Sequence, residues 1–84
     1  MTTDLQRVPW VGPSTERALL EVGVNRIADL RSQQPDELYD RLCDVRGERI
    51  DPCVKYVFRC AVYWATTPDP DADLLKWWNW KDRA

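Results

Sequence analysis

Histidine is missing from this chain of 84 residues. Its absence removes the side chain that most often serves as general base, proton shuttle and metal ligand. Cysteine occurs three times, an odd number, and the first residues contain no apolar segment of the kind that directs secretion. We therefore expect reduced thiols and a cytoplasmic protein. No apolar run approaches the ~20 residues that a bilayer-spanning helix needs, so we expect no membrane partner.

An excess of basic charge is also missing. The chain has 12 basic and 14 acidic residues, which gives a formal net charge of −2. A strong non-specific binder of nucleic acid is usually basic, so this balance argues against one while leaving room for a local basic patch. The length suits one small domain with a modest core, and we expect a single domain over residues 1–84. Five tryptophans enlarge that core, because each indole buries roughly 150–250 Å².

The most apolar stretch of the chain predicts the helix around which the rest folds. Asp51 is placed to cap its first turn, and Pro52 suits the first helical position because no amide hydrogen is needed there. Beyond that turn only Lys55 and Arg59 are charged, and at a spacing of four they share one narrow stripe. A helix that is apolar around most of its circumference is normally buried on several sides. We therefore predict a central buried helix over residues 52–66.

Lys55 and Arg59 have two interpretations. They form a basic patch together with Arg49 or Lys76, or they form a solvated stripe that pairs with Asp51 or another carboxylate. We favour the stripe, because isolated charges on an otherwise apolar helix usually serve to meet solvent.

The cysteines do not predict a metal site. Cys53 and Cys60 are seven residues apart in the predicted central helix, which separates them by about 10.5 Å along its axis. A zinc–sulfur bond is about 2.3 Å long, so one ion cannot join both thiols, and the same separation excludes a disulfide. Cys43 with either of them makes a poor site without histidine. We expect no metal and no cofactor, and thiols that are buried as small apolar groups.

Helical spacing of apolar residues also marks the remainder of the chain, without strand-like alternation. Gly23 and Gly47 are placed to end two helices, and Asn25 is placed to cap the short one that follows Gly23. Glu16 and Arg17 fall on an outward face. We predict an all-α, compact bundle of five to six short helices, with further segments near residues 4–7, 13–22 and 35–46, around Ile27 and Leu30, and in the Trp-rich segment 72–84.

Three tryptophans lie close together in that last segment. We expect Trp77 and one of its two neighbours, Trp78 or Trp80, to fold back on the central helix, and we expect the third ring to be exposed. A stacking platform for single strands is the sharper alternative. A membrane anchor is disfavoured, because the segment lacks a sustained amphipathic helix and an excess of basic residues.

Catalysis finds little support in the sequence. The carboxylates of Asp69, Asp71 and Asp73 cluster around a proline-rich turn and a helix start, where capping accounts for them. No nucleophile–base pair and no phosphate-binding loop signature is visible. We therefore expect no enzyme and name no catalytic residue.

Residues 4–23 resemble a helix-hairpin-helix motif, in the run Leu5-x-x-Val8-Pro-Trp-Val-Gly-Pro-Ser-Thr-Glu-Arg-Ala-Leu-Leu-Glu-Val-Gly23. Two further runs, Asp51-Pro-Cys-Val-Lys-Tyr-Val-Phe-Arg-Cys-Ala-Val-Tyr63 and Leu75-Lys-Trp-Trp-Asn-Trp-Lys-Asp82, resemble the small bacterial pathogenicity-locus helix-hairpin-helix family. Some members of that family carry a mitomycin-resistance label. The resemblance covers nearly the whole chain and implies an all-α fold.

The resemblance also implies a binding site. In helix-hairpin-helix domains the hairpin contacts the nucleic-acid backbone without reading sequence, because amides of the turn and of the helix start point at a phosphate. The matching residues here are Trp10, Val11, Gly12, Ser14, Thr15 and Arg17.

Three positions depart from the motif. Trp10 stands where the first glycine is usual, Ser14 where a lysine is common, and Glu16 where an alanine is common. Each departure weakens phosphate binding. The ring of Trp10 has another possible use, because stacking on an unpaired base contributes about 1–3 kcal/mol.

Two functional hypotheses follow from these patterns. The first is a non-catalytic helix-hairpin-helix module that binds DNA weakly and without sequence preference through the backbone. The second is an adaptor for protein–protein interaction that keeps the fold and has lost the DNA contacts. Salt-sensitive DNA binding distinguishes the first from the second.

Overall fold

The computed structural model describes residues 3–81, and within this range the chain is entirely helical. It contains four α-helices and three 3-10 helices. The prediction of an all-α fold is confirmed. The α-helices are fewer than the five to six short helices expected, because the first segment and the Trp-rich segment form 3-10 helices instead. In chain order the elements are η1 (Asp4–Arg7), α1 (Pro13–Glu21), α2 (Ile27–Leu30), α3 (Pro35–Arg46), α4 (Cys53–Thr66), η2 (Ala72–Leu75) and η3 (Trp77–Trp80).

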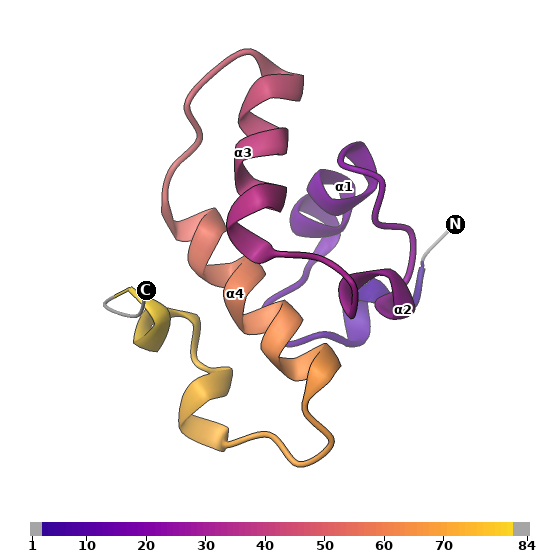
Figure 1. Cartoon of the computed structure of the whole chain (residues 1–84), viewed down its shortest axis with the longest axis vertical. Coiled ribbons are helices and arrows are strands. Elements are labelled where there is room, and N and C mark those ends of the chain that lie inside the picture. The colour runs from indigo at the N-terminus through magenta and orange to yellow at the C-terminus, as the bar shows by residue number, and fades with distance from the viewer. Residues whose placement is uncertain (1–2, 82–84) are drawn as a thin grey trace.

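Helix α4 lies at the centre of the molecule. It contacts α3, α2, η2 and η3, and Figure 1 shows it crossing the middle of the view with α3 above it and the C-terminal segment folded below. The Asp51 carboxylate accepts a hydrogen bond from the amide of Cys53 at 2.9 Å, as expected of a cap, and the helix begins at Cys53. None of its residues from 54 to 65 is exposed. Phe58 is fully buried in the core.

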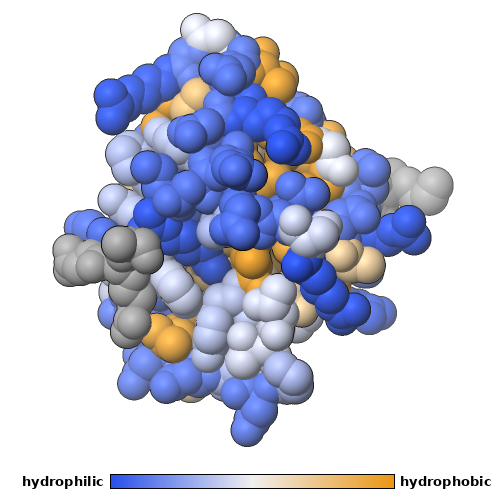
Figure 2. All heavy atoms as spheres, viewed as in Figure 1, coloured by the Kyte–Doolittle hydropathy of each residue, from blue (hydrophilic) through white to orange (hydrophobic). Residues whose placement is uncertain are grey.

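The core combines side chains from the first five elements and from the loops beside them. Figure 2 shows that the outer face in the same view is mostly polar, with only small apolar patches between polar side chains. Burial of the apolar groups is the main favourable term for so small a chain. The largest fully buried side chains are Phe58, Leu5, Leu19, Leu30, Leu38, Leu42, Val8, Val24 and Cys60.

Two predicted helix ends are confirmed. Gly23 follows α1 with a φ of +90°, and Gly47 ends α3 with a φ of +65°, both in the left-handed region that favours glycine. The predicted cap of α2 is wrong. Arg26 occupies the N-cap position in place of Asn25 and makes no side-chain cap, and the Asp4 carboxylate accepts from the amide of Ile27 at 3.0 Å.

Residues 72–81 of the Trp-rich segment fold back on α4, as expected, and residues 82–84 of the predicted segment lie outside the described residues. The indole of Trp80 lies 5.5 Å from the ring of Tyr63, and its Nε1 donates to the carbonyl of Leu74 at 2.7 Å. Trp77 is half-buried, whereas Trp78 is the exposed ring of the three. Among the described residues no helix has both the length and the apolar character needed to cross a bilayer.

Candidate nucleic-acid interface

The predicted site begins in the loop that joins η1 to α1. The amide of Val11 donates to the carbonyl of Val8 at 3.2 Å, which closes a tight turn around Pro9 and Trp10. Val8 and Val11 are buried and fix this turn to the core. Trp10 has a φ of +70°, in the left-handed region that bulky residues rarely adopt. The largest side chain of the loop therefore stands where the backbone favours glycine.

The first turn of α1 supplies unpaired donors. Gly12 occupies the N-cap position without a side-chain cap, and Pro13 follows it as the first helical residue. The carbonyl of Gly12 accepts from the amide of Glu16 at 2.9 Å. Within residues 3–81 the amides of Gly12, Ser14 and Thr15 have no acceptor. Such amides, at the positive end of the helix dipole, suit an anion.

Glu16 does not face outward as predicted. It is buried and accepts hydrogen bonds from the amide of Thr3 at 3.0 Å, from the Thr3 hydroxyl at 2.7 Å and from Nε2 of Gln6 at 3.1 Å. These bonds, that of the Thr3 hydroxyl first, lower the pKa of the Glu16 carboxyl below its ordinary value. Glu16 therefore joins the start of η1 to α1. Helical periodicity missed this role, because the partners come from another element.

The six predicted residues lie on one continuous segment, but they differ in what they can offer. The side chains of Trp10, Ser14 and Arg17 are exposed, and that of Thr15 is half-buried. Val11 is buried, so only its backbone is available for contact. A ligand at this segment would therefore meet backbone amides, two hydroxyls, one indole and one guanidinium.

The C-terminal segment completes the surface beside Trp10. The indole Nε1 of Trp10 donates to the carbonyl of Leu75, and its ring centroid lies 5.4 Å from that of Trp78, at an interplanar angle of 68°. Trp77 in turn lies 5.8 Å from Trp78, edge to face. Sequence reasoning assigned Trp78 to the tail and did not place it at the hairpin. The contact joins positions more than sixty residues apart, and no local pattern encodes it.

Lys55 and Arg59 form no basic patch. The Arg59 guanidinium binds both carboxylate oxygens of Asp36, at 2.8 and 2.9 Å, and lies 5.6 Å from the ring of Tyr56. Hydrogen bonding to Arg59 lowers the pKa of the Asp36 carboxyl. The ammonium of Lys55 lies 5.0 Å from the Tyr39 ring. The pairing with a carboxylate is confirmed for Arg59, with Asp36 as its partner, but the stripe is not solvated as predicted, because the Arg59 side chain is only 13% exposed.

The thiols are free, and the described residues contain no cluster that could hold a metal ion. Cys60 is buried, and burial raises the pKa of its thiol to about 11. Cys43 is half-buried. Cys53 is exposed at the start of α4, so the expectation of burial is wrong for this residue. It lies in the first turn of the helix, ahead of the part that other elements cover.

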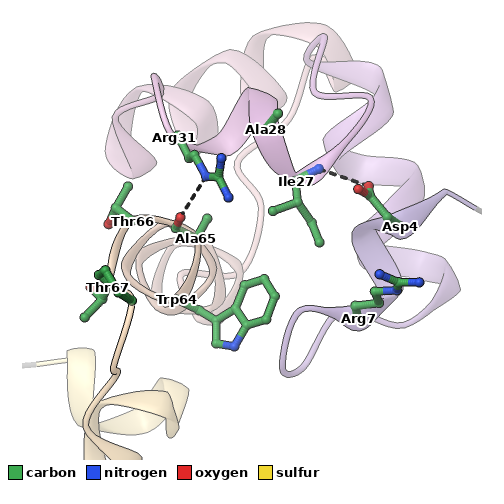
Figure 3. Close-up of a pocket in the computed structure, with 10 residues that line it drawn as sticks. Asp4, Arg7, Ile27, Ala28, Arg31, Trp64, Ala65, Thr66 and Thr67 are labelled. Atoms are coloured by element: carbon green, nitrogen blue, oxygen red, sulfur yellow. Dashed lines mark hydrogen bonds between the residues drawn. The ribbon is translucent and has the colours of Figure 1, made fainter.

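A groove of about 770 Å³ lies away from the hairpin, between η1, α2 and the end of α4. Figure 3 shows the indole of Trp64 facing this space, with Arg31 donating to the carbonyl of Ala65 above it. None of the six predicted residues lines it. The lining residues are Asp4, Arg7, Ile27, Ala28, Arg31, Trp64, Ala65, Thr66, Thr67 and Pro68.

Comparison with known proteins decides the family. A family model described as "Pathogenicity locus" matches residues 1–84. The chain belongs to the pathogenicity-locus family. The resemblance read from the central helix and the Trp-rich segment is thereby confirmed.

A curated relative carries a functional name. The pathogenicity-locus chain is 34% identical, over 77 aligned residues, to "Mitomycin resistance protein McrB" of Streptomyces lavendulae. The match covers 80% of this chain and 73% of the relative. No solved structure matches this pathogenicity-locus protein.

Proposed function

We propose that this protein is a non-catalytic helix-hairpin-helix module that binds the DNA backbone without sequence preference. The contact surface is the segment from Trp10 to Arg17. The observation that carries the proposal is the set of three amides, those of Gly12, Ser14 and Thr15, that have no acceptor within residues 3–81 at the start of a nine-residue helix. A phosphate oxygen would satisfy them, and the helix dipole favours its charge.

The backbone of the hairpin supports this proposal. In the motif the first hairpin position is usually glycine, and Trp10 at that position keeps a left-handed φ of +70°. Gly12 occupies the second glycine position and opens α1. Trp10 therefore combines a bulky side chain with the backbone conformation that glycine favours.

The charges near the hairpin support weak binding. Arg17 is exposed in α1. Glu16 is the acidic residue that departs from the motif. Its carboxylate already accepts hydrogen bonds from Thr3 and Gln6. Arg17 alone neutralises about one phosphate, in a chain whose net charge is −2.

The number of neutralised phosphates determines how strongly salt weakens DNA binding. One neutralised phosphate predicts a slope of about −0.9 in log K against log salt. The dissociation constant should then rise about 3.5-fold between about 50 and about 200 mM salt. Two labelled duplexes of unrelated sequence should show the same affinity and the same slope in fluorescence anisotropy.

Two matched arginine variants distinguish a phosphate contact at the hairpin from an effect of the overall charge. Arg17→Ala should lower the slope by about 0.9, which is the loss of one phosphate contact. Arg49→Ala removes the same charge from the exposed connection between α3 and α4 and should leave the slope unchanged. Absence of binding at low salt, or an affinity that salt does not alter, would refute the proposal.

A protein–protein adaptor is the second candidate. Its support is the net charge of −2 together with two exposed apolar side chains, Leu20 on α1 and Val45 on α3. These helices contact each other. A stoichiometric protein partner whose capture is lost in Leu20→Ser or Val45→Ser, alongside a DNA titration without signal, would favour the adaptor.

A further inference from the structure

Two tryptophans beside the hairpin remain about half exposed. Trp10 is 49% exposed and Trp78 is 44% exposed, although their rings contact each other edge to face. Trp10 also holds the positive φ of +70° that a bulky residue adopts only at a cost. About half of the Trp10 side chain remains exposed beside the hairpin, so its ring is a candidate for contact with a ligand.

The ring of Trp10 is held in place. The Nε1 of Trp10 donates to the carbonyl of Leu75, and the ring of Trp78 packs against the ring of Trp10. The ring of Trp77 contacts Trp78 in turn. The single polar atom of the Trp10 side chain is therefore occupied. What remains exposed on Trp10 is aromatic surface, which recognises a flat partner by stacking and provides no hydrogen-bond donor.

We propose that Trp10 and Trp78 form a stacking site for unpaired nucleobases, so that the module prefers single-stranded DNA to duplex DNA. This inference rests on the proposed function, because the hairpin supplies the strand. Trp10 lies two residues before Gly12, whose amide begins the phosphate-binding set. A strand whose phosphate occupies the start of α1 thus brings its own bases beside Trp10. In a duplex those bases are covered by their neighbours and paired, whereas in a single strand each has a free face.

Binding to an abasic strand isolates the contribution of the bases. The probes are a labelled oligothymidylate of about 12 nucleotides, an abasic strand with the same phosphates, and a duplex of about the same length. At about 50 mM salt, anisotropy should show the oligothymidylate binding about tenfold more tightly than the abasic strand or the duplex. Trp78→Ala should remove this preference and leave affinity for the abasic strand unchanged.

Two matched variants control for general effects. Trp78→Phe retains an aromatic face and should keep most of the preference, and Leu20→Ala removes an exposed apolar side chain elsewhere and should keep all of it. Circular dichroism establishes that each variant is folded. A uniform loss of affinity for all three probes in Trp78→Ala would assign Trp78 a structural role and overturn the inference.

The outcomes also separate this inference from the proposed function. Equal, salt-sensitive affinity for all three probes would refute stacking and leave backbone binding in place. Absence of binding to any probe would refute both. Self-association of the wild type that Trp78→Ala abolishes in sedimentation would assign the aromatic surface to a second copy of this chain, and would overturn the inference as well.

Discussion

At position 10 we predict that a glycine variant is more stable than an alanine variant, which reverses the usual order. At an ordinary position glycine is less stable than alanine by about 0.5–1 kcal/mol, because it loses more backbone entropy on folding. Trp10 has a φ of +70°, where a Cβ atom costs about 1–2 kcal/mol. Trp10→Gly relieves that strain and Trp10→Ala retains it. We therefore expect Trp10→Gly to be more stable than Trp10→Ala by about 1 kcal/mol.

Both variants should be less stable than the wild type. About half of the Trp10 side chain is buried, which is about 110 Å² and stabilises by about 3 kcal/mol. The hydrogen bond to the carbonyl of Leu75 adds about 1 kcal/mol. The expected loss in the free energy of unfolding is therefore about 4 kcal/mol for Trp10→Ala and about 3 kcal/mol for Trp10→Gly.

Urea denaturation followed by far-ultraviolet circular dichroism measures this order without relying on tryptophan fluorescence. Asp40 provides the control, because it is exposed in the middle of α3, where Asp40→Gly should be less stable than Asp40→Ala by about 1 kcal/mol. The same order at both positions, with alanine the more stable, would refute the left-handed conformation of Trp10.

Three further predictions concern the core, the Glu16 cluster and the thiols. Phe58→Ala should lower the free energy of unfolding by about 3–5 kcal/mol, because Phe58 is fully buried; a loss below about 1 kcal/mol in urea denaturation would contradict that burial. The pKa of Glu16 is lowered in the folded state, because Thr3 and Gln6 donate hydrogen bonds to its carboxylate. The ionised carboxylate therefore stabilises the fold fully near neutral pH, and this stabilisation is lost as the pH falls through the lowered pKa. The difference in urea midpoint between wild type and Glu16→Gln should therefore shrink below about pH 4 and stay constant above about pH 6, and a pH-independent difference would argue against the bonds to Thr3. Because burial raises the pKa of Cys60 to about 11, iodoacetamide at about pH 8 should alkylate exposed Cys53 first and Cys60 only on unfolding; equal labelling in peptide mass spectrometry would contradict the buried position of Cys60.

Patterns with a local cause could be predicted from the sequence. The helix over residues 53–66 follows from an apolar circumference and from Asp51, whose carboxylate accepts a hydrogen bond from the first helical amide. Pro52, predicted as the first helical residue, is the N-cap, so the helix begins one residue later than predicted. Gly23 and Gly47 end helices because the left-handed conformation costs them little. In each case the cause and its effect lie within a few residues of each other.

Features that depend on distant partners could not be predicted. Periodicity placed Glu16 on an outward face, yet Thr3 supplies two donors that draw it inward. Asn25 is a good cap by residue type, yet Asp4 reaches the amide of Ile27 from another element. Sequence patterns predict which groups need partners, and the packing of helices decides which partners they meet.

The candidate site also combines a local feature that could be predicted with a distant contact that could not. The six hairpin residues lie within the eight-residue run 10–17, so resemblance to a motif located them as one segment. Trp78 joins them through a contact with Trp10 that spans most of the chain. Only the fold of the C-terminal segment against α4 brings that ring to the hairpin, and no spacing rule relates the two positions.

Backbone amide shifts test the central claim most directly. In ¹H–¹⁵N correlation spectra of the wild-type protein, adding duplex DNA at about 50 mM salt should move the amide signals of Gly12, Ser14 and Thr15 most, because a phosphate would become their acceptor. Those shifts should recede as salt is raised to about 200 mM. No change at these three amides, or largest changes around Trp64 in the separate groove, would contradict binding through the hairpin.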